Sequence, residues 1–236
     1  MKLLGVRIDN LSRKEILEKI EFFLNEDKFH QIATVNPEFI LRAQKDSAFK
    51  NILNQCDLNV ADGVGIWYAF LRFGKFLQTR LAGVDLLEEI LKIANKQKLS
   101  VFLAVSKEGL SSYEEIAKVL SGKYPNIKFS GSDIDPNITD YQLLVTSYCL
   151  LLCNFGAPFQ EVFIRSQKDA KIRLGMGVGG SFDFLTGKIS RAPRPMRKLG
   201  LEWLWRLLRQ PVYRTKRILK AVIIFPLKIL FSKNPG

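Results

Sequence analysis

Short apolar runs alternate with amphipathic segments along the first 190 residues, and this alternation limits the possible folds more than any other feature. Residues 101–105 (Val-Phe-Leu-Ala-Val) form an uninterrupted apolar run, which is typical of a strand covered on both faces in a parallel sheet. Residues 12–24 show the other pattern. Ser12 precedes Glu15 at capping-box spacing, and apolar side chains then recur every three or four positions. The sequence therefore predicts an α/β fold.

The same reading places the remaining elements. We expect strands at residues 3–8, 31–35, 58–61, 101–105, 127–130, 150–153 and 170–174. We expect helices at residues 12–24, 37–54, 63–70, 86–98, 110–120, 141–148 and 160–167, with Asn36 capping the second and Asp85 capping the fourth. This order predicts a Rossmann-like, mostly parallel sheet with helices on both faces, forming one domain over residues 1–190.

From Arg191 the sequence changes character. The last 49 residues hold 13 Lys or Arg and one acid, while the 187 before them hold 23 bases and 22 acids. We expect an amphipathic helix at 199–208, then a basic helix and an apolar stretch at 221–227 that Pro226 breaks. A spanning helix needs roughly 20 apolar residues, so residues 191–236 are predicted to form a basic amphipathic helical appendage on an anionic membrane surface.

Cysteine usage and the N-terminus indicate the compartment. Cys56, Cys149 and Cys153 form no even-numbered disulfide framework, and the first ten residues are too poor in apolar side chains for a secretory signal. We expect a cytoplasmic protein with reduced thiols, peripheral to the inner face of the membrane. Its oligomeric state stays open, a homo-oligomer included.

Polar residues follow two early strands, at the sheet edge where parallel sheets bind ligands. Thr34 and Asn36 close one strand, and Asp62 follows the next in Ala-Asp-Gly-Val-Gly. Each residue also has an ordinary structural interpretation. Asn36 can cap a helix, Thr34 can be a β-branched strand residue, and Asp62 can cap the helix at 63–70.

Two later segments have the same placement. Gln160 and Glu161 follow Gly-Ala-Pro, where they can simply begin a helix. The glycine-rich residues 175–180 run into Asp183. These glycines come too late in the chain for a nicotinamide fingerprint, but the amides of such a turn can contact a phosphate or a ribose.

The sequence offers little for a metal. Asp133 and Asp135 spell the Asp-x-Asp pattern that can hold a divalent cation, but they lie in a turn-rich stretch without a second acidic cluster. His30 is the single histidine, so a zinc site has no support. We expect a solvated loop at the two aspartates, and no metal or other cofactor.

Six segments in order resemble one family, the bacterial glycosyltransferases named for WecG, TagA and CpsF. They are Thr-Val-Asn-Pro-Glu (34–38), Ala-Asp-Gly-Val-Gly (61–65), Arg-Leu-Ala-Gly-Val-Asp-Leu (80–86), Gly-Ala-Pro-Phe-Gln-Glu (156–161), Gly-Val-Gly-Gly-Ser-Phe-Asp-Phe (177–184), and Arg-Ala-Pro (191–193) leading to Leu-Glu-Trp-Leu-Trp-Arg-Leu (201–207).

The resemblance implies transfer of N-acetylmannosamine from UDP-N-acetylmannosamine to N-acetylglucosamine linked through diphosphate to undecaprenol. It also implies a β-1,4 product bond, inversion, metal independence and a place in wall teichoic acid linkage-unit synthesis. A related donor, such as the uronic acid of N-acetylmannosamine, stays open.

The resemblance also implies roles for residues. Asp62 would be the base that takes the proton of the acceptor hydroxyl, and Thr34 and Asn36 would orient the sugar or that hydroxyl. The remaining candidates bind substrate: the diphosphate by Arg80, Arg206 and Arg214, the nucleotide by Gly177, Gly179, Gly180 and Asp183, and the sugar or uridine by Gln160 and Glu161.

Two other classes of protein compete with this reading. A nucleic-acid binder could use the basic tail, but Trp203, Trp205 and an aliphatic run interleave the bases, which suits lipid better than a phosphate backbone. We therefore expect no nucleic-acid partner. A nicotinamide oxidoreductase is disfavoured by the late position of residues 175–180.

Overall fold

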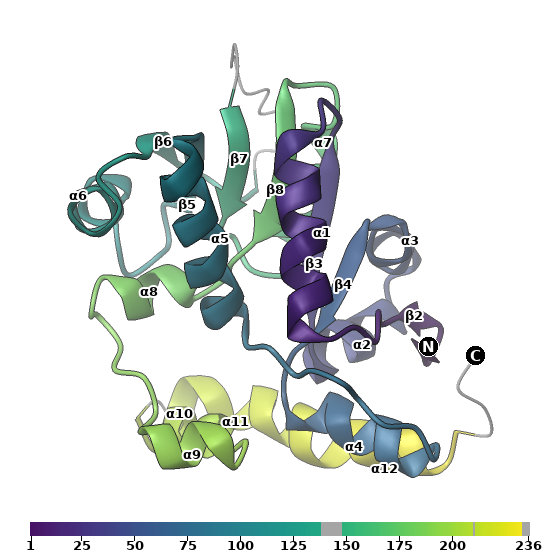
Figure 1. The fold of residues 1–236 in the computed structure, drawn as a ribbon. Helices are drawn as coiled ribbons and strands as arrows, with labels where there is room; N and C mark the ends of the chain where they lie inside the picture. Colours follow the sequence, from purple (N-terminus) through teal and green to yellow (C-terminus); the bar gives the residue numbers. More distant parts are fainter. Residues whose placement is uncertain (138–147, 210, 233–236) are drawn as a thin grey trace.

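The computed structural model describes residues 1–137, 148–209 and 211–232, apart from the side chains of residues 148, 198, 213, 214 and 216. A six-stranded sheet forms its centre (Figure 1). The strand order is β4-β3-β8-β7-β5-β6 and every neighbouring pair is parallel. The strands are β3 (His30–Val35), β4 (Leu58–Ala61), β5 (Ser100–Ser106), β6 (Lys128–Ile134), β7 (Tyr148–Cys153) and β8 (Ile172–Gly177). The predicted α/β class and parallel sheet are confirmed.

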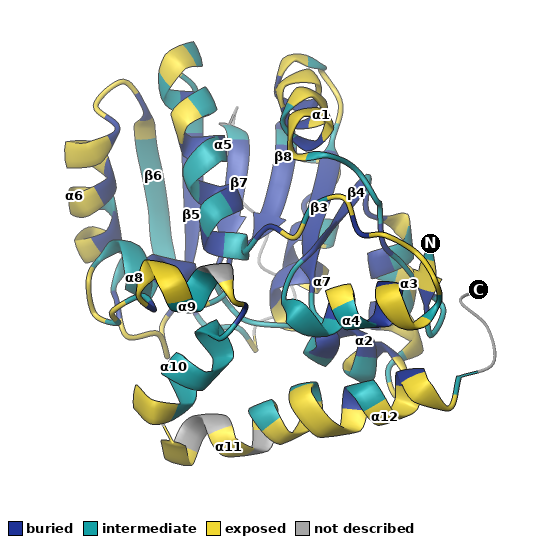
Figure 2. Ribbon diagram, turned by 60° about the horizontal axis from the view of Figure 1, so that its bottom comes forward, coloured by how far each residue is buried: buried dark blue, intermediate teal, exposed yellow. Residues whose placement is uncertain are grey.

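Helices cover both faces of the sheet, and the alternation of each strand explains why. On β3, Ile32 lies in one apolar cluster while Ala33 and Val35 lie in another on the opposite face. The first face is covered by α1 (Arg13–Asn25), α5 (Gly83–Gln97), α6 (Tyr113–Lys123) and α8 (Ser181–Leu185). The second is covered by α2 (Pro37–Ala43), α3 (Ser47–Gln55), α4 (Val64–Arg72) and α7 (Phe159–Ser166). Figure 2 shows the inner strands buried between these layers, whereas the edge strand β6 is of intermediate exposure.

Two helix starts form as their local sequence predicts. Ser12 and Glu15 make a complete capping box at the start of α1. Asn36 caps α2, where its Oδ1 accepts the Phe39 N–H at 3.1 Å, and Pro37 takes the first helical position.

Several predicted elements are wrong in detail. Residues 3–8 are a hairpin, not one strand: β1 (Lys2–Leu3) pairs antiparallel with β2 (Val6–Arg7), and Leu4 and Gly5 both turn with positive φ. The single helix at 37–54 is two helices, because Asp46 caps α3 anew by accepting the Phe49 N–H.

The expected cap at Asp85 is also wrong. Helix α5 already begins at Gly83, and Asp85 lies in its first turn, where its carboxylate pairs with Arg191 instead. Helix α6 begins at Tyr113 rather than at residue 110, because Ser112 and Glu115 form its capping box. The helix expected at 141–148 falls outside the described residues, apart from residue 148, which begins β7.

The C-terminal tail crosses below the carboxyl ends of the strands (Figure 1). It consists of α9 (Arg194–Lys198), α10 (Glu202–Arg209), α11 (Pro211–Leu219), the π-helical η1 (Lys220–Ile224) and α12 (Phe225–Leu230). The helix expected at 199–208 is α10, which begins three residues later, and Gly200, at φ 75°, separates it from α9. Along the described residues, no helix combines the length and apolar character needed to span a bilayer.

Pro226 does not break the tail as predicted. The preceding turn is π-helical, and the Phe225 N–H donates to the Lys220 carbonyl five residues back. This wider turn lets the chain continue into α12 with Pro226 in its first turn. As a result, Phe225 and Ile229 reach the body, where both are fully buried against the cluster that includes Ile66 and Phe70 of α4.

Candidate active site

Asp62 lies at the carboxyl end of β4 and begins the site. Its N–H donates to the Val35 carbonyl at 2.9 Å, which extends the β3–β4 ladder by one residue. Its half-buried carboxylate accepts the N–H of Gly83 at the start of α5. The N-cap of α4 is Gly63, which has no side-chain cap bond. The cap interpretation of Asp62 is therefore wrong, and its carboxylate faces α5 and the tail.

The tail brings charge to Asp62. Burial raises the pKa of its carboxyl to about 6, Arg206 and Arg80 lower it, and Glu202 raises it. Two of these three partners, Arg206 and Glu202, come from α10, 140 or more residues away in sequence. The result is a carboxylate that is ionised at neutral pH yet basic enough to accept a proton.

Arg206 is held in place from two sides. Its Nη2 lies 3.6 Å from a carboxylate oxygen of Glu202, and its guanidinium lies over the Phe184 ring, 4.7 Å from the centroid. Nearby, Arg191 forms a bidentate pair with Asp85, at 2.7 and 3.2 Å. These contacts fasten the start of the tail over the site.

Arg80 joins the body to the tail. Its Nη2 donates to the Arg197 carbonyl at 3.1 Å, and the turn at Gly200 packs against it, since a side chain there would meet Arg80 Nη1 at 3.2 Å. The structure thus brings Arg80 and Arg206 to Asp62. Arg214 lies in α11, but its side chain is outside the described part.

Thr34 and Asn36 differ in what they do. Thr34 is buried beside Asp62: it pairs with Val60, two residues before Asp62, and a side chain at Gly83 would meet its Oγ1 at 3.2 Å. The Oδ1 of Asn36 instead accepts the Phe39 N–H and so caps α2. The ordinary interpretation of Asn36 as a helix cap is confirmed.

Gln160 and Glu161 form a buried brace under the loops that end β7 and β8. Gln160 Oε1 accepts the N–H groups of Gly156 and Gly179, at 3.2 and 3.1 Å, and its Nε2 donates to Glu161 Oε1 at 2.6 Å. A side chain at Gly177 would come within 2.3 Å of Gln160 Nε2. This packing explains the glycine at Gly177, which lies in β8 rather than in a turn.

Glu161 is a buried acid with no positively charged side chain among the groups that set its pKa. It is 1% exposed, and within the described residues its Oε2 has no hydrogen-bond partner. Burial raises the pKa of its carboxyl to about 8, against a smaller lowering by the bond from Gln160. This pKa favours the protonated, uncharged carboxyl at neutral pH, and in that form Glu161 supports Gln160 through their hydrogen bond.

We expect Glu161→Gln to stabilise the protein as pH rises. The folded chain keeps the Glu161 proton between about pH 4.5 and 8, where the unfolded chain has released it, so this group makes folding less favourable across that window. Gln cannot titrate and keeps an acceptor for Gln160. Urea unfolding at pH 5 and pH 8 should show the variant gaining about 3 kcal/mol relative to the native protein at the higher pH, because each pKa unit corresponds to about 1.4 kcal/mol. An equal difference at both values would contradict a protonated Glu161.

Asp183 precedes Phe184, the residue whose ring contacts Arg206 of the tail. It is in α8, next to Phe184, and its Oδ1 accepts the Ser111 Oγ–H at 3.2 Å. A side chain at Gly180 would lie 3.6 Å from its Oδ2. Gly180, Asp183 and the Arg206–Phe184 contact are therefore close together.

An open pocket of about 730 Å³ lies beside Asp183, at the carboxyl ends of β5 and β6, with Lys107, Ser111 and Lys188 in its lining. The solvated loop expected at the two aspartates is wrong for Asp133, which lies in β6, lines this pocket and accepts the Tyr113 N–H, while Asp135 follows the strand and bonds Asn137. No group of three or more potential metal ligands occurs among the residues that the structure describes.

Sequence reasoning assigned no role to Glu202, Gly83 or Phe184. Glu202 carried a signal, because it is the single acid among the last 49 residues. A single acid among many bases is expected to form an ion pair, and Arg206, four residues later on the same helix, is in position to do so. Nothing in the sequence pointed to Phe184 as a support for Arg206.

The fold and the site define an α/β protein in which a half-buried carboxylate, Asp62, lies at the carboxyl edge of a parallel sheet beside residues of a basic tail. A sequence model of the Glycosyl transferase WecG/TagA/CpsF family matches residues 1–235, and the chain belongs to this family of glycosyltransferases. The sequence resemblance is therefore confirmed.

Two relatives show how far the similarity extends. The chain is 35% identical over 193 residues, 80% of this chain and 74% of the relative, to a protein of Bacillus subtilis (strain 168). It is 32% identical over 241 residues, 98% of this chain and 92% of the relative, to one of Staphylococcus aureus (strain MRSA252). Both are named N-acetylglucosaminyldiphosphoundecaprenol N-acetyl-beta-D-mannosaminyltransferase.

Proposed function

We propose that this glycosyltransferase transfers N-acetylmannosamine from UDP-N-acetylmannosamine to N-acetylglucosaminyl-diphospho-undecaprenol. The product would be the β-1,4-linked disaccharide of the wall teichoic acid linkage unit. The names of its relatives support this acceptor and this sugar. The observation that carries the proposal is the placement of the Asp62 carboxylate beside Arg206 and Arg80.

The proposed reaction is a metal-independent inverting displacement. The acceptor hydroxyl attacks the anomeric carbon, Asp62 accepts the hydroxyl proton, and the bond to the UDP oxygen breaks on the opposite side. Arg80 and Arg206 would stabilise the charge that develops on the leaving diphosphate. Thr34, buried next to Asp62, would help to orient the attacking hydroxyl.

The nucleotide would lie beyond the ends of β8, β7 and β5. The turn at Gly179 and Gly180 and the carboxylate of Asp183 would contact it, and Gln160 holds this turn by accepting the Gly179 N–H. Gln160 and Glu161 would therefore act on the donor through these loops, because both are buried. Asn36 would act in the same indirect way, by holding the start of α2.

We further propose that the tail docks this enzyme on the cytoplasmic, inner face of the membrane as a peripheral protein. The excess positive charge of the chain lies in this tail, and exposed apolar side chains occur along α11, η1 and α12, among them Val212, Ile223 and Leu227. Basic and apolar side chains together favour an anionic bilayer surface. A lipid-linked acceptor would be reached from there.

The direct test supplies both substrates. Purified protein is incubated with UDP-N-acetylmannosamine and a short-chain lipid-diphosphate-N-acetylglucosamine, and the product mass is read. A mass increase of one N-acetylhexosamine is expected. A parallel reaction with UDP-N-acetylmannosaminuronic acid separates the related donor. Product from the uronic acid alone would overturn the donor assignment, and product from neither would overturn the reaction.

We expect Arg206→Gln to move the acid limb of the pH–activity profile to higher pH. Arg206 lowers the pKa of Asp62, so its loss raises that pKa, and a smaller fraction of Asp62 is ionised at any given pH near 6. Activity at pH 6 should fall about tenfold or more, with a smaller loss at pH 8. The readout is kcat/KM from pH 5 to 9.

Arg209→Gln is the matched control. Arg209 is in the same helix, but its guanidinium lies over Trp205 rather than beside Asp62, so its profile should keep the native limb. Arg206→Lys should restore the limb because it restores the positive charge. An unshifted limb in Arg206→Gln would separate Arg206 from Asp62.

A further inference from the structure

Body and tail together form an exposed apolar surface on the lower side of the molecule. The body contributes Trp67 and Leu71 of α4 and Phe76 of the following loop, which are 45%, 58% and 78% exposed. The tail contributes exposed side chains of η1 and α12: Ile223, Ile224, Leu227, Leu230 and Phe231. We call these eight residues the α4–α12 surface.

Helices α4 and α12 lie side by side and run in the same direction. At their starts, a side chain at Gly65 would meet the Phe225 ring at 3.4 Å. At their ends, Arg72 Nη2 donates to the Leu230 carbonyl at 3.2 Å. Figure 2 shows exposed stretches of both helices on the side that faces the viewer.

The core fixes which side of each helix is left exposed. Ile66 and Phe70 of α4 and Phe225 and Ile229 of α12 are buried in one cluster. The helical repeat therefore turns Leu71 and Leu227 away from the body. Large apolar side chains that do not pack into the core are thus grouped on one surface. An exposed apolar patch of this kind is typical of an interaction site.

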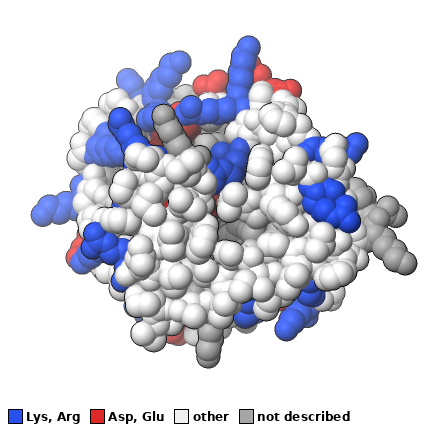
Figure 3. All heavy atoms as spheres, turned by 90° about the horizontal axis from the view of Figure 1, so that it is seen from below, with Lys and Arg blue, Asp and Glu red and all other residues white. Residues whose placement is uncertain are grey.

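The charges at this surface indicate its partner. Residues 63–84 and 203–236 contain no Asp or Glu. The exposed bases Arg72, Lys75, Lys220 and Lys228 belong to the same segments. Figure 3 shows this side of the molecule as largely uncharged, with Lys and Arg around the uncharged area and one group of them near its middle. An apolar centre with basic borders complements an anionic bilayer, whereas two copies of this chain would bring like charges together.

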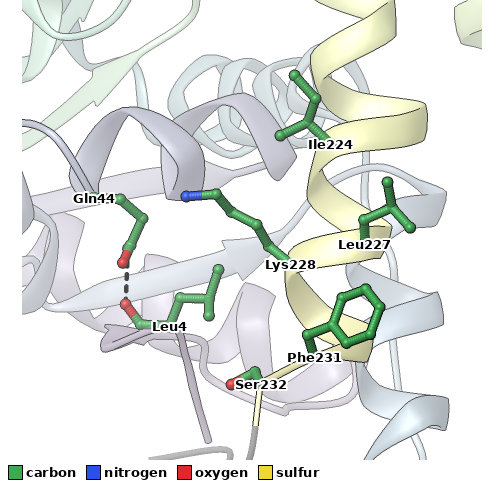
Figure 4. Close-up of a pocket in the computed structure, with 7 residues that line it drawn as sticks. All are labelled: Leu4, Gln44, Ile224, Leu227, Lys228, Phe231 and Ser232. Carbon is green, nitrogen blue, oxygen red and sulfur yellow. Dashed lines mark hydrogen bonds between the residues drawn. The ribbon is translucent and has the colours of Figure 1, made fainter.

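The surface also has a concave part. A groove of about 470 Å³ lies between α12 and the body, lined by Leu4 and Gln44 on one side and by Ile224, Leu227 and Phe231 on the other (Figure 4). Lys228 extends across it toward Gln44. An apolar groove with one ammonium group fits an acyl chain below an anionic headgroup.

We propose that α4 and the Phe76 loop enter the interfacial layer of an anionic bilayer together with α12, so that the catalytic body itself contacts the membrane. This inference rests on the proposed lipid-linked acceptor and goes beyond docking by the tail alone. Only Gly63 separates Asp62 from the first residue of α4. Seating α4 in the interface therefore places the base next to the depth at which a lipid diphosphate lies.

The test measures vesicle binding without either substrate, so it does not depend on the transfer reaction. Full-length protein is co-sedimented with vesicles of phosphatidylglycerol and phosphatidylcholine. The variant Trp67→Gln/Leu71→Gln/Phe76→Gln removes only the contribution of the body. Its partition coefficient should fall about tenfold or more, because binding scales with the apolar area inserted. Activity on a water-soluble short-chain acceptor should stay at the native level.

Phe22→Gln is the matched control. Phe22 is 60% exposed, like the targets, but it lies near the end of α1, away from the α4–α12 surface. Its variant should bind vesicles like the native protein. Native binding by the triple variant, with an unchanged thermal melt, would overturn the proposal. So would self-association of the native protein that the triple substitution abolishes while vesicle binding persists.

Discussion

Asp62→Asn is expected to lower kcat by roughly a hundredfold or more while UDP binding and the fold stay intact. Asparagine has nearly the same shape, and its carbonyl can still accept the Gly83 N–H, but it cannot take the proton of the acceptor hydroxyl. Burial already disfavours the charged carboxylate and raises its pKa to about 6. The neutral amide should therefore be tolerated in the folded protein.

The pH profile identifies the reason for the loss. Asp62 must be ionised to act as a base, so native kcat/KM should fall as pH drops through about 6. The residual activity of Asp62→Asn should lack this limb. Asp135→Asn is a matched control, because Asp135 bonds Asn137 in the β6 loop, and it should retain native activity. Near-native turnover of Asp62→Asn would remove Asp62 from the role of base.

Phe225→Ala is expected to destabilise the whole protein by about 3–5 kcal/mol. Phe225 is fully buried between tail and body, in the cluster that contains Val35 and Phe70. Removing its ring leaves a cavity that the surrounding helices and sheet cannot fill without moving. The expected measurement is a single urea unfolding transition with a lowered midpoint and an unchanged slope.

Phe231→Ala is the control, since Phe231 is 78% exposed and its loss should change stability by less than about 0.5 kcal/mol. The pair of variants also tests the proposed division at residue 191. If the tail is an independent appendage, Phe225→Ala will leave the main transition unchanged. If the tail is part of the core, removing residues 192–236 will expose Ile66 and Phe70, and the remaining body will be less stable than the full chain.

The elements that depend on neighbouring residues could be predicted from the sequence. The Ser12–Glu15 capping box and the Asn36-Pro37 helix start formed as expected, because every atom involved lies within four residues. The apolar run at 101–105 became a buried central strand, since continuous apolar character is needed wherever both faces of a sheet are covered. Turns were harder: one positive-φ pair, Leu4-Gly5, changed a strand into a hairpin.

The sequence by itself determined the α/β class, the parallel sheet and the basic tail. Only the tertiary structure decided that Glu202 and Arg206 lie near Asp62, that Gln160 holds the loops after β7 and β8, and that α4 shares a surface with α12. The physical reason is distance along the chain. A helix or a strand is specified by residues a few positions apart, whereas a charge raises or lowers a pKa through space, and the path of the folded backbone fixes which charges come near.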